Sequence, residues 1–99
     1  MERFSKRLVK MIVLEYTPKF KKLFYKLPTN IQELARKVLN KLEQQPFGNR
    51  LTGSLRESYS IHFYGNRYRI IWTKINDKII VYYIGKRTDH FYEDVSKYL

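Results

Sequence analysis

The chain of 99 residues contains no cysteine, and its only histidines are His62 and His90. The absence of cysteine excludes a disulfide scaffold, a thiol nucleophile and every zinc or iron–sulfur site built on thiolates. The two histidines are too far apart in sequence to form a His-x-x-x-His ligand pair on one helix. We therefore expect a protein without a metal site or any other cofactor.

Acidic residues and long apolar runs are also scarce. Only 9 Asp and Glu stand against 20 Lys and Arg, which gives a net charge of +11 and a pI near 10.0. A chain this basic favours phosphate-bearing polymers or acidic proteins as partners. The longest apolar run, residues 79–84, is far shorter than the ~20 residues that span a bilayer, so we expect no membrane partner. The apolar run at residues 11–14 is too short for the core of an export signal, so we expect a cytoplasmic protein.

The length fits one domain, because single domains typically have about 100–150 residues. No internal repeat, low-complexity tract or Gly/Ser-rich linker divides the sequence. Residues 1–10 are polar and basic, and we expect them to form an N-terminal arm. Residues 11–99 then form the single domain.

Residues 11–16 form a short β-type run, and helical spacing begins directly after it. Thr17-Pro18 suits a helix N-cap followed by proline at the first helical position. An apolar stripe then extends over residues 18–27 and ends at Pro28, because proline interrupts a helix. Four residues make up this stripe, and we expect them in the core: Phe20, Leu23, Phe24 and Leu27.

A second apolar stripe with helical spacing occupies residues 29–45, which a proline and a glycine follow. Either Thr29 with Gln32 or Asn30 with Glu33 can form a capping box at the start of this helix. Its six apolar residues are also expected in the core: Ile31, Leu34, Ala35, Val38, Leu39 and Leu42.

The second half of the chain changes to strand periodicity. Three segments are rich in β-branched and aromatic side chains: residues 59–64, 67–74 and 78–84. The separators Gly65-Asn66 and Asn76-Asp77 are typical of two-residue hairpin turns, and together they predict an antiparallel meander. A short helix is predicted over residues 88–99. The expected order is β-α-α-β-β-β-α, an α+β fold with the meander packed on the two N-terminal helices.

The first hairpin turn predicts which side chains face each other. With Gly65-Asn66 as a two-residue turn, His62 lies directly opposite Arg69. Because strand side chains alternate, one face then presents Ser60, His62, Tyr64, Arg67, Arg69, Tyr82 and Ile84. Lys86 and Arg87 follow the last strand, and we expect them on the same surface. The aromatic and aliphatic residues of the opposite face are expected to pack on the helices.

Arginine and histidine on one open surface are suited to a phosphodiester. Arginine binds phosphate through two parallel hydrogen bonds and keeps its charge at every accessible pH. Histidine exchanges protons near neutral pH, so His62 can act as general acid or base. The simplest reaction without a metal is attack by an RNA 2′-hydroxyl on its neighbouring phosphate, with arginine stabilising the transition state. There are two alternatives. His62 and Arg69 can be an exposed strand pair without a function, or the surface can bind RNA or an acidic protein without cleavage.

Four segments of the chain resemble the RelE/ParE toxin superfamily, and the resemblance covers residues 11–99. In order they are R-L-T-G-S-L-R at 50–56, Y-S-I at 59–61, N-R-Y-R-I-I-W at 66–72 and I-G-K-R at 84–87. The resemblance implies a toxin of a type II toxin–antitoxin pair, which an acidic antitoxin wraps and neutralises, in a complex that often represses its own operon. RelE-like members cleave mRNA in the ribosomal A site without a metal, by 2′-hydroxyl attack. ParE-like members share the fold, lack the nuclease site and poison DNA gyrase.

The resemblance also implies roles for individual residues. Arg69 matches the arginine that contacts the scissile phosphate, and Arg87 matches the one that stabilises it. Tyr92 lies near the family's C-terminal tyrosine, although it is one residue closer to Arg87 than the family's spacing. RelE-like members have two lysines where this sequence has Ser60 and His62. Either His62 supplies the acid–base function in their place, or the nuclease activity is reduced or lost.

The leading hypothesis is therefore a ribosome-dependent mRNA endoribonuclease that inhibits translation. Its predicted catalytic residues are Arg69, Arg87, His62 and Tyr92. Its predicted RNA-binding residues are Arg50, Arg56, Ser60, Arg67 and Lys86. The expected partners are the ribosome with mRNA, a cognate acidic antitoxin and, through the antitoxin, operator DNA. The alternatives are a gyrase-inhibiting toxin of the ParE type and an RNA-binding protein on the same scaffold without catalysis.

Overall fold

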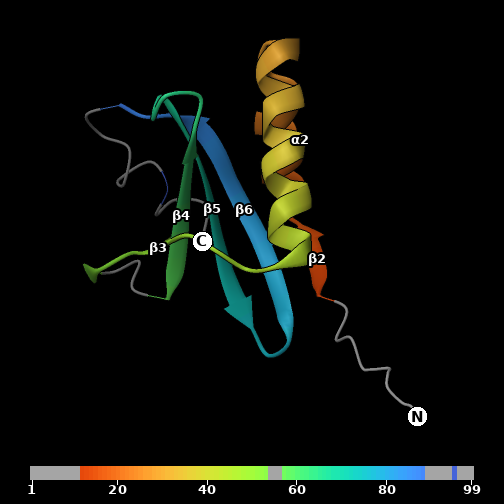
Figure 1. The fold of residues 1–99 in the computed structure, drawn as a ribbon, viewed down its shortest axis with the longest axis vertical. Coiled ribbons are helices and arrows are strands. Elements are labelled where there is room, and N and C mark those ends of the chain that lie inside the picture. The colour runs from red at the N-terminus through yellow and green to blue at the C-terminus, as the bar shows by residue number, and fades with distance from the viewer. Residues whose placement is uncertain (1–11, 54–56, 89–94, 96–99) are drawn as a thin grey trace.

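The computed structural model describes residues 12–53, 57–88 and 95, which contain two helices and a five-stranded sheet (Figure 1). In chain order the elements are β2 (Val13–Tyr16), α1 (Pro18–Tyr25), α2 (Thr29–Gln44), β3 (Asn49–Arg50), β4 (Ser58–Phe63), β5 (Tyr68–Ile75) and β6 (Lys78–Lys86). This order confirms the predicted α+β fold. The predicted arm, residues 1–10, lies outside the described residues, and so does the predicted terminal helix except for Thr88 and Val95.

Helix α1 begins as the sequence predicts. The side-chain oxygen of Thr17 accepts a hydrogen bond from the backbone N–H of Phe20 at 3.1 Å, and Pro18 is the first helical residue. This bond satisfies one of the backbone N–H groups that a helix leaves without a partner in its first turn. In the described part of the chain, no helix is long and apolar enough to cross a membrane.

Helix α2 begins without the predicted capping box. Its N-cap is Pro28, whose side chain makes no capping hydrogen bond, and Thr29 is the first helical residue. The Pro28 carbonyl accepts from the backbone N–H groups of Ile31 and Gln32, at 3.0 Å in each case. The Gln32 side chain instead donates to the Leu27 carbonyl oxygen at 2.9 Å. The capping-box prediction is therefore wrong, because the helix starts one residue earlier than a Thr29 cap requires and two residues earlier than an Asn30 cap requires.

The five described strands lie in the order β2-β6-β5-β4-β3. Strands β4, β5 and β6 form the predicted antiparallel meander. Strand β2 lies beside β6 and parallel to it, with Tyr16 opposite Val81. Parallel neighbours need a long connection, and here both helices and the rest of the meander lie between the two strands in sequence. At the other edge, the two-residue strand β3 pairs with β4, which the sequence pattern did not predict.

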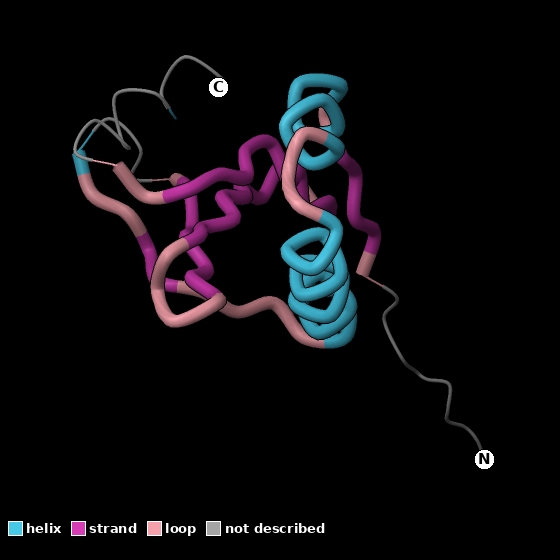
Figure 2. Tube along the Cα trace, turned by 90° about the horizontal axis from the view of Figure 1, so that it is seen from above, coloured by secondary structure: helices cyan, strands magenta, loops and turns pink. Residues whose placement is uncertain are grey.

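Both helices lie against one face of the meander (Figure 2). The main core is formed there by residues from α1, α2, β4, β5 and β6: Phe20, Phe24, Ile31, Ala35, Leu39, Leu42, Ile61, Phe63, Ile70, Trp72, Ile79, Val81 and Ile84. The helical stripes and the predicted inner face of the sheet are thus confirmed. A smaller cluster on the opposite face joins Ile71, Tyr82, Tyr83 and Val95.

A β-bulge in β6 alters the predicted outer face. Ile71 pairs with Tyr83 and Trp72 pairs with Val81, so Tyr82 is the extra residue of the bulge. After the bulge the alternation shifts by one, and Ile84 pairs with Ile70 in the helix-facing core, where it is fully buried. The prediction that Ile84 lies on the polar face is therefore wrong.

Candidate functional site

Two rows of residues cross the sheet near the β4–β5 turn, and the side chains of the first row lie on the face away from the helices. In the first row, His62 on β4 is the register partner of Arg69 on β5, as predicted, and Arg69 is in turn the partner of Gly85 on β6. Opposite residues of antiparallel strands have Cβ atoms about 4.5–5.5 Å apart, so the two side chains leave the sheet side by side.

The second row lies at the end of the sheet that contains the β4–β5 turn. The Arg67 backbone N–H donates to the Tyr64 carbonyl at 3.2 Å, and the Arg87 N–H donates to the Arg67 carbonyl at 2.9 Å. Arg67 is therefore flanked by Tyr64 and Arg87. The Arg67 guanidinium lies 5.9 Å from the centre of the Tyr64 ring, within the range of a cation–π interaction.

We call these five residues the basic surface: His62, Tyr64, Arg67, Arg69 and Arg87. All are exposed except Arg69, which is partly buried. Three guanidinium groups on an open surface favour binding of a polyanion, because each can donate two hydrogen bonds to one phosphate. The exposed ring of Tyr64 is available for stacking on an unpaired base.

The turn between β4 and β5 has unusual backbone geometry. Tyr64, Gly65 and Asn66 all have positive φ, at 55°, 61° and 73°. Glycine and asparagine adopt this region readily, whereas a tyrosine there is uncommon and costs conformational energy. Such strain often lies at functional sites, where the surrounding structure maintains it. Here it sets the direction of the Tyr64 side chain, whose ring centre lies 6.1 Å from that of Tyr68 and 5.9 Å from the Arg67 guanidinium.

The bulge also reverses the side on which Lys86, the last residue of β6, is expected. Lys86 is the register partner of Tyr68, which packs against the helix-facing core. The side chain of Lys86 therefore belongs to the helix-facing side, and the prediction that it joins the arginines is wrong. Arg87 follows on the opposite side, beside Arg67.

Ser60 is on the predicted face but is only 1% exposed. Its register partners are Asn49 on β3 and Ile71 on β5. In this structure the hydroxyl is therefore not at the surface, where the sequence analysis expected it to contact RNA. The alternation of β4 predicted the face correctly, but no signal in the sequence indicated that this part of the face is covered.

Ser58 and Tyr82 form a buried polar pair on the same face, with their hydroxyl oxygens 2.7 Å apart. Burial raises the pKa of Tyr82 above its usual value, and the hydrogen bond with Ser58 lowers it in part. This pair joins β4 to the β6 bulge and helps to hold the strands beneath the basic surface.

The remaining predicted residues are elsewhere or outside the described part of the chain. Arg50 is exposed on the edge strand β3, where it pairs with Tyr59, several residues along β4 from His62. Arg56 and Tyr92 lie outside the described residues.

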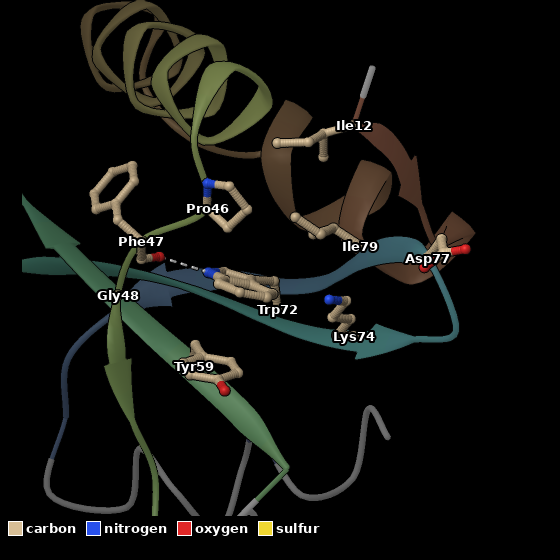
Figure 3. A pocket seen from close by; sticks show the side chains of 9 residues that line it. All are labelled: Ile12, Pro46, Phe47, Gly48, Tyr59, Trp72, Lys74, Asp77 and Ile79. Carbon is tan, nitrogen blue, oxygen red and sulfur yellow. Dashed lines mark hydrogen bonds between the residues drawn. The ribbon is translucent and has the colours of Figure 1, made fainter. Parts of the chain in front are cut away.

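A cavity of about 380 Å³ lies on the helix-facing side of the sheet, beyond the end of α2 (Figure 3). The Tyr59 and Trp72 rings stack there with their centres 4.4 Å apart, and the Trp72 indole N–H donates to the Phe47 carbonyl at 3.0 Å. Lys74 and Asp77 are its charged lining residues. The basic surface is on the other face, so the two features are separate. Within residues 12–53, 57–88 and 95, no three His, Cys, Asp or Glu side chains gather in a way that could hold a metal ion.

Comparison with solved structures identifies the fold. The isolated RelE toxin of E. coli matches with 26% sequence identity and a TM-score of 0.67, over 89% of this chain and 99% of that one. The intact RelBE toxin–antitoxin complex of E. coli matches with 25% identity and a TM-score of 0.67, over 78% and 98%. The RelBE2 toxin–antitoxin complex of Mycobacterium tuberculosis matches with 17% identity and a TM-score of 0.69, over 79% and 100%. No protein-family model and no curated protein sequence matches the chain.

These matches confirm the predicted RelE-like toxin superfamily and its α+β fold. They support, more particularly, a toxin of a type II toxin–antitoxin system, with an antitoxin as its partner.

Proposed function

We propose that this toxin inhibits translation by cleaving mRNA on the ribosome. The observation that supports the proposal most directly is the basic surface, with His62 opposite Arg69 and with Arg67 between Tyr64 and Arg87. A general acid–base group and phosphate-binding groups are adjacent there, on a face open enough for a polymer. We place the protein in the cytoplasm with the ribosome, and propose that an acidic antitoxin neutralises it and couples it to operator DNA.

In the proposed reaction, the 2′-oxygen of the RNA attacks the adjacent phosphorus and the bond from phosphorus to the 5′-oxygen breaks. The 2′-hydroxyl proton passes to a general base, and a proton from a general acid neutralises the departing 5′-oxygen. We assign one of these roles to His62, and proton transfer or positioning to Tyr92. Arg69 and Arg87 stabilise the negative charge that develops on the phosphate oxygens. The products are a 2′,3′-cyclic phosphate and a 5′-hydroxyl end.

Binding of the RNA backbone is proposed for the exposed basic residues around this centre. Arg67 is next to Arg87 in the second row, and Tyr64 offers a ring for stacking. We retain Arg50 and Arg56 as candidates for contacts farther along the strand. We assign no RNA contact to Lys86 or Ser60, because the first faces the other side of the sheet and the second is buried.

The experiment is cleavage of a defined mRNA on purified ribosomes, with the ends of the products mapped. The wild type should produce ribosome-dependent cuts with 2′,3′-cyclic phosphate ends, and Arg69→Ala/Arg87→Ala should abolish them. Lys74→Ala is the matched control, because it removes a positive charge from the opposite face of β5 and should leave cleavage unchanged.

Absence of cleavage by the wild type would contradict the proposal. Continued toxicity in cells with DNA damage in place of a translation block would then indicate the ParE-like alternative. Absence of both cleavage and toxicity would indicate a binding protein without catalysis.

A further inference from the structure

Arg69 is contacted by a residue of the β4–β5 turn. Its Nη2 donates a hydrogen bond to the side-chain oxygen of Asn66 at 3.1 Å. Asn66 has φ of 73°, a backbone conformation for which glycine is the least strained residue. Asparagine also tolerates this conformation, and unlike glycine it provides a side-chain acceptor. The turn therefore combines its backbone geometry with a contact to the central arginine of the basic surface.

On its other side, Arg69 faces a position without a side chain. Its partner on β6 is Gly85, and the ring of Tyr83 lies over this glycine. A Cβ atom at residue 85 would be 2.9 Å from the Tyr83 hydroxyl oxygen and 3.1 Å from the adjacent ring carbon Cε2. The phenol thus occupies the space that a side chain opposite Arg69 would otherwise fill. Tyr83 itself is 8% exposed, so its ring is held by packing.

We propose that Asn66 and Tyr83 are positioning residues that orient the Arg69 guanidinium from its two sides. An arginine side chain has many rotamers, and groups that restrict it in advance reduce the reorganisation needed when phosphate binds. The guanidinium carries its N–H donors in one rigid plane, so restricting the side chain also fixes the direction in which they point. This inference rests on the proposed function of Arg69 in phosphate stabilisation.

Asn66→Gly tests the hydrogen bond to Arg69, and Tyr83→Phe tests the hydroxyl group that lies over Gly85 opposite it, both with little change to the fold. Glycine keeps the positive φ of the turn and removes the acceptor, whereas phenylalanine keeps the ring over Gly85 and removes the hydroxyl. Asn76→Gly is the matched control, because Asn76 has φ of 56° in the other hairpin turn, far from Arg69. Asn66→Gly should lower kcat for ribosome-dependent cleavage roughly 3- to 10-fold, the range expected for one lost hydrogen bond, and Tyr83→Phe should lower it in the same direction. KM should change little, because orientation of the guanidinium matters most in the transition state.

A second readout does not depend on nuclease activity. The ¹⁵N heteronuclear NOE of the Arg69 Nε reports how rigid the guanidinium is, and the signal can be assigned by its loss in Arg69→Lys. The NOE should fall in Asn66→Gly and in Tyr83→Phe and stay unchanged in Asn76→Gly. An unchanged NOE in either test variant overturns the role of that residue, whatever its effect on cleavage. If the wild-type protein cleaves no RNA, the proposed function fails, while the NOE still decides whether the two residues position Arg69.

Discussion

Ser58 and Tyr82 are buried polar residues of the sheet. The hydrogen bond between their hydroxyl groups offsets the free-energy cost of burying them. A buried hydroxyl without a partner costs about 1–3 kcal/mol, so the two residues depend on each other. The pair lies at the β6 bulge, where the sheet hydrogen bonding is interrupted. It therefore supports the strand that continues to Gly85 and Arg87.

Tyr82→Phe should lower the free energy of unfolding by about 1 kcal/mol near neutral pH, because it removes this hydrogen bond. It should also change the response to alkali. Burial raises the pKa of Tyr82 above its usual value of 10.0, so the unfolded chain loses the phenol proton at lower pH than the folded protein. The contribution of Tyr82 to stability is thus complete below pH 10.0 and is lost as the pH rises through the raised pKa.

Urea unfolding at a series of pH values tests this prediction. The decline of stability in alkali should be smaller in Tyr82→Phe than in the wild type. Tyr25→Phe is the control, since this ring is 67% exposed and its loss of a hydroxyl should have little effect. An equal alkaline decline in the wild type and Tyr82→Phe would contradict the prediction.

At the same scale, Ser60 and Lys86 show where prediction from the sequence failed. Alternation identifies the face on which a strand residue lies, and for Ser60 it was correct. It does not identify what covers that face, and burial of Ser60 depends on contacts remote in sequence. For Lys86 the alternation itself was shifted. The extra residue, Tyr82, moves every later residue of β6 to the face opposite the one predicted.

The β4–β5 hairpin is the element that the sequence determined best. Gly65-Asn66 predicted the turn, and the turn predicted the pairing of His62 with Arg69. Two-residue turns with positive φ restrict the register of both strands, so a local signal was sufficient. The β6 bulge had no such signal, because Tyr82 and Tyr83 are both aromatic and either can occupy the outer face. The start of α2 was also misplaced, since Thr29 and Asn30 fit the capping pattern equally well.

Helix α1 provides a direct test of the capping assignment. Thr17→Ala should lower the free energy of unfolding by about 1 kcal/mol, because the Phe20 N–H loses its acceptor. Thr29→Ala is the matched control, since Thr29 is the first residue of α2 and does not cap it, and it should cost about 0.5 kcal/mol or less. Both values can be measured by urea unfolding. Equal effects of the two substitutions would show that the Thr17 hydrogen bond does not stabilise α1.

At the scale of the whole molecule, the positive charge is distributed over both faces. Of the 20 Lys and Arg, 12 are in residues 1–50, whereas the residues of the basic surface are all in the second half of the sequence. A net charge of +11 attracts any polyanion, and only the arrangement of a few arginines gives one face a specific role. Composition predicts a polyanion or an acidic protein as partner, and hairpin register predicted the pairing of His62 with Arg69.

Binding to single-stranded RNA should weaken steeply as salt is added, because bound phosphates release counterions. Arg67→Ala should reduce the slope of log Kd against log salt by about 0.7, the value for one phosphate contact to a single strand. Fluorescence anisotropy with a short labelled oligonucleotide in which deoxyribose blocks cleavage measures this slope. Lys74→Ala, on the opposite face of β5, should leave the slope unchanged. The same slope in Arg67→Ala and the wild type would exclude Arg67 from the RNA contact.

The position of β6 between β2 and β5 affects how this protein is made. Strand β6 provides Gly85, leads into Arg87 and is also the partner of the first described strand, β2. The first row therefore lacks its β6 position, and the second row lacks Arg87, until the nascent chain has left the ribosome as far as residue 87. Pairing over such a long sequence separation is also slow. The complete site is thus assembled only when β6, the last described strand, joins the sheet.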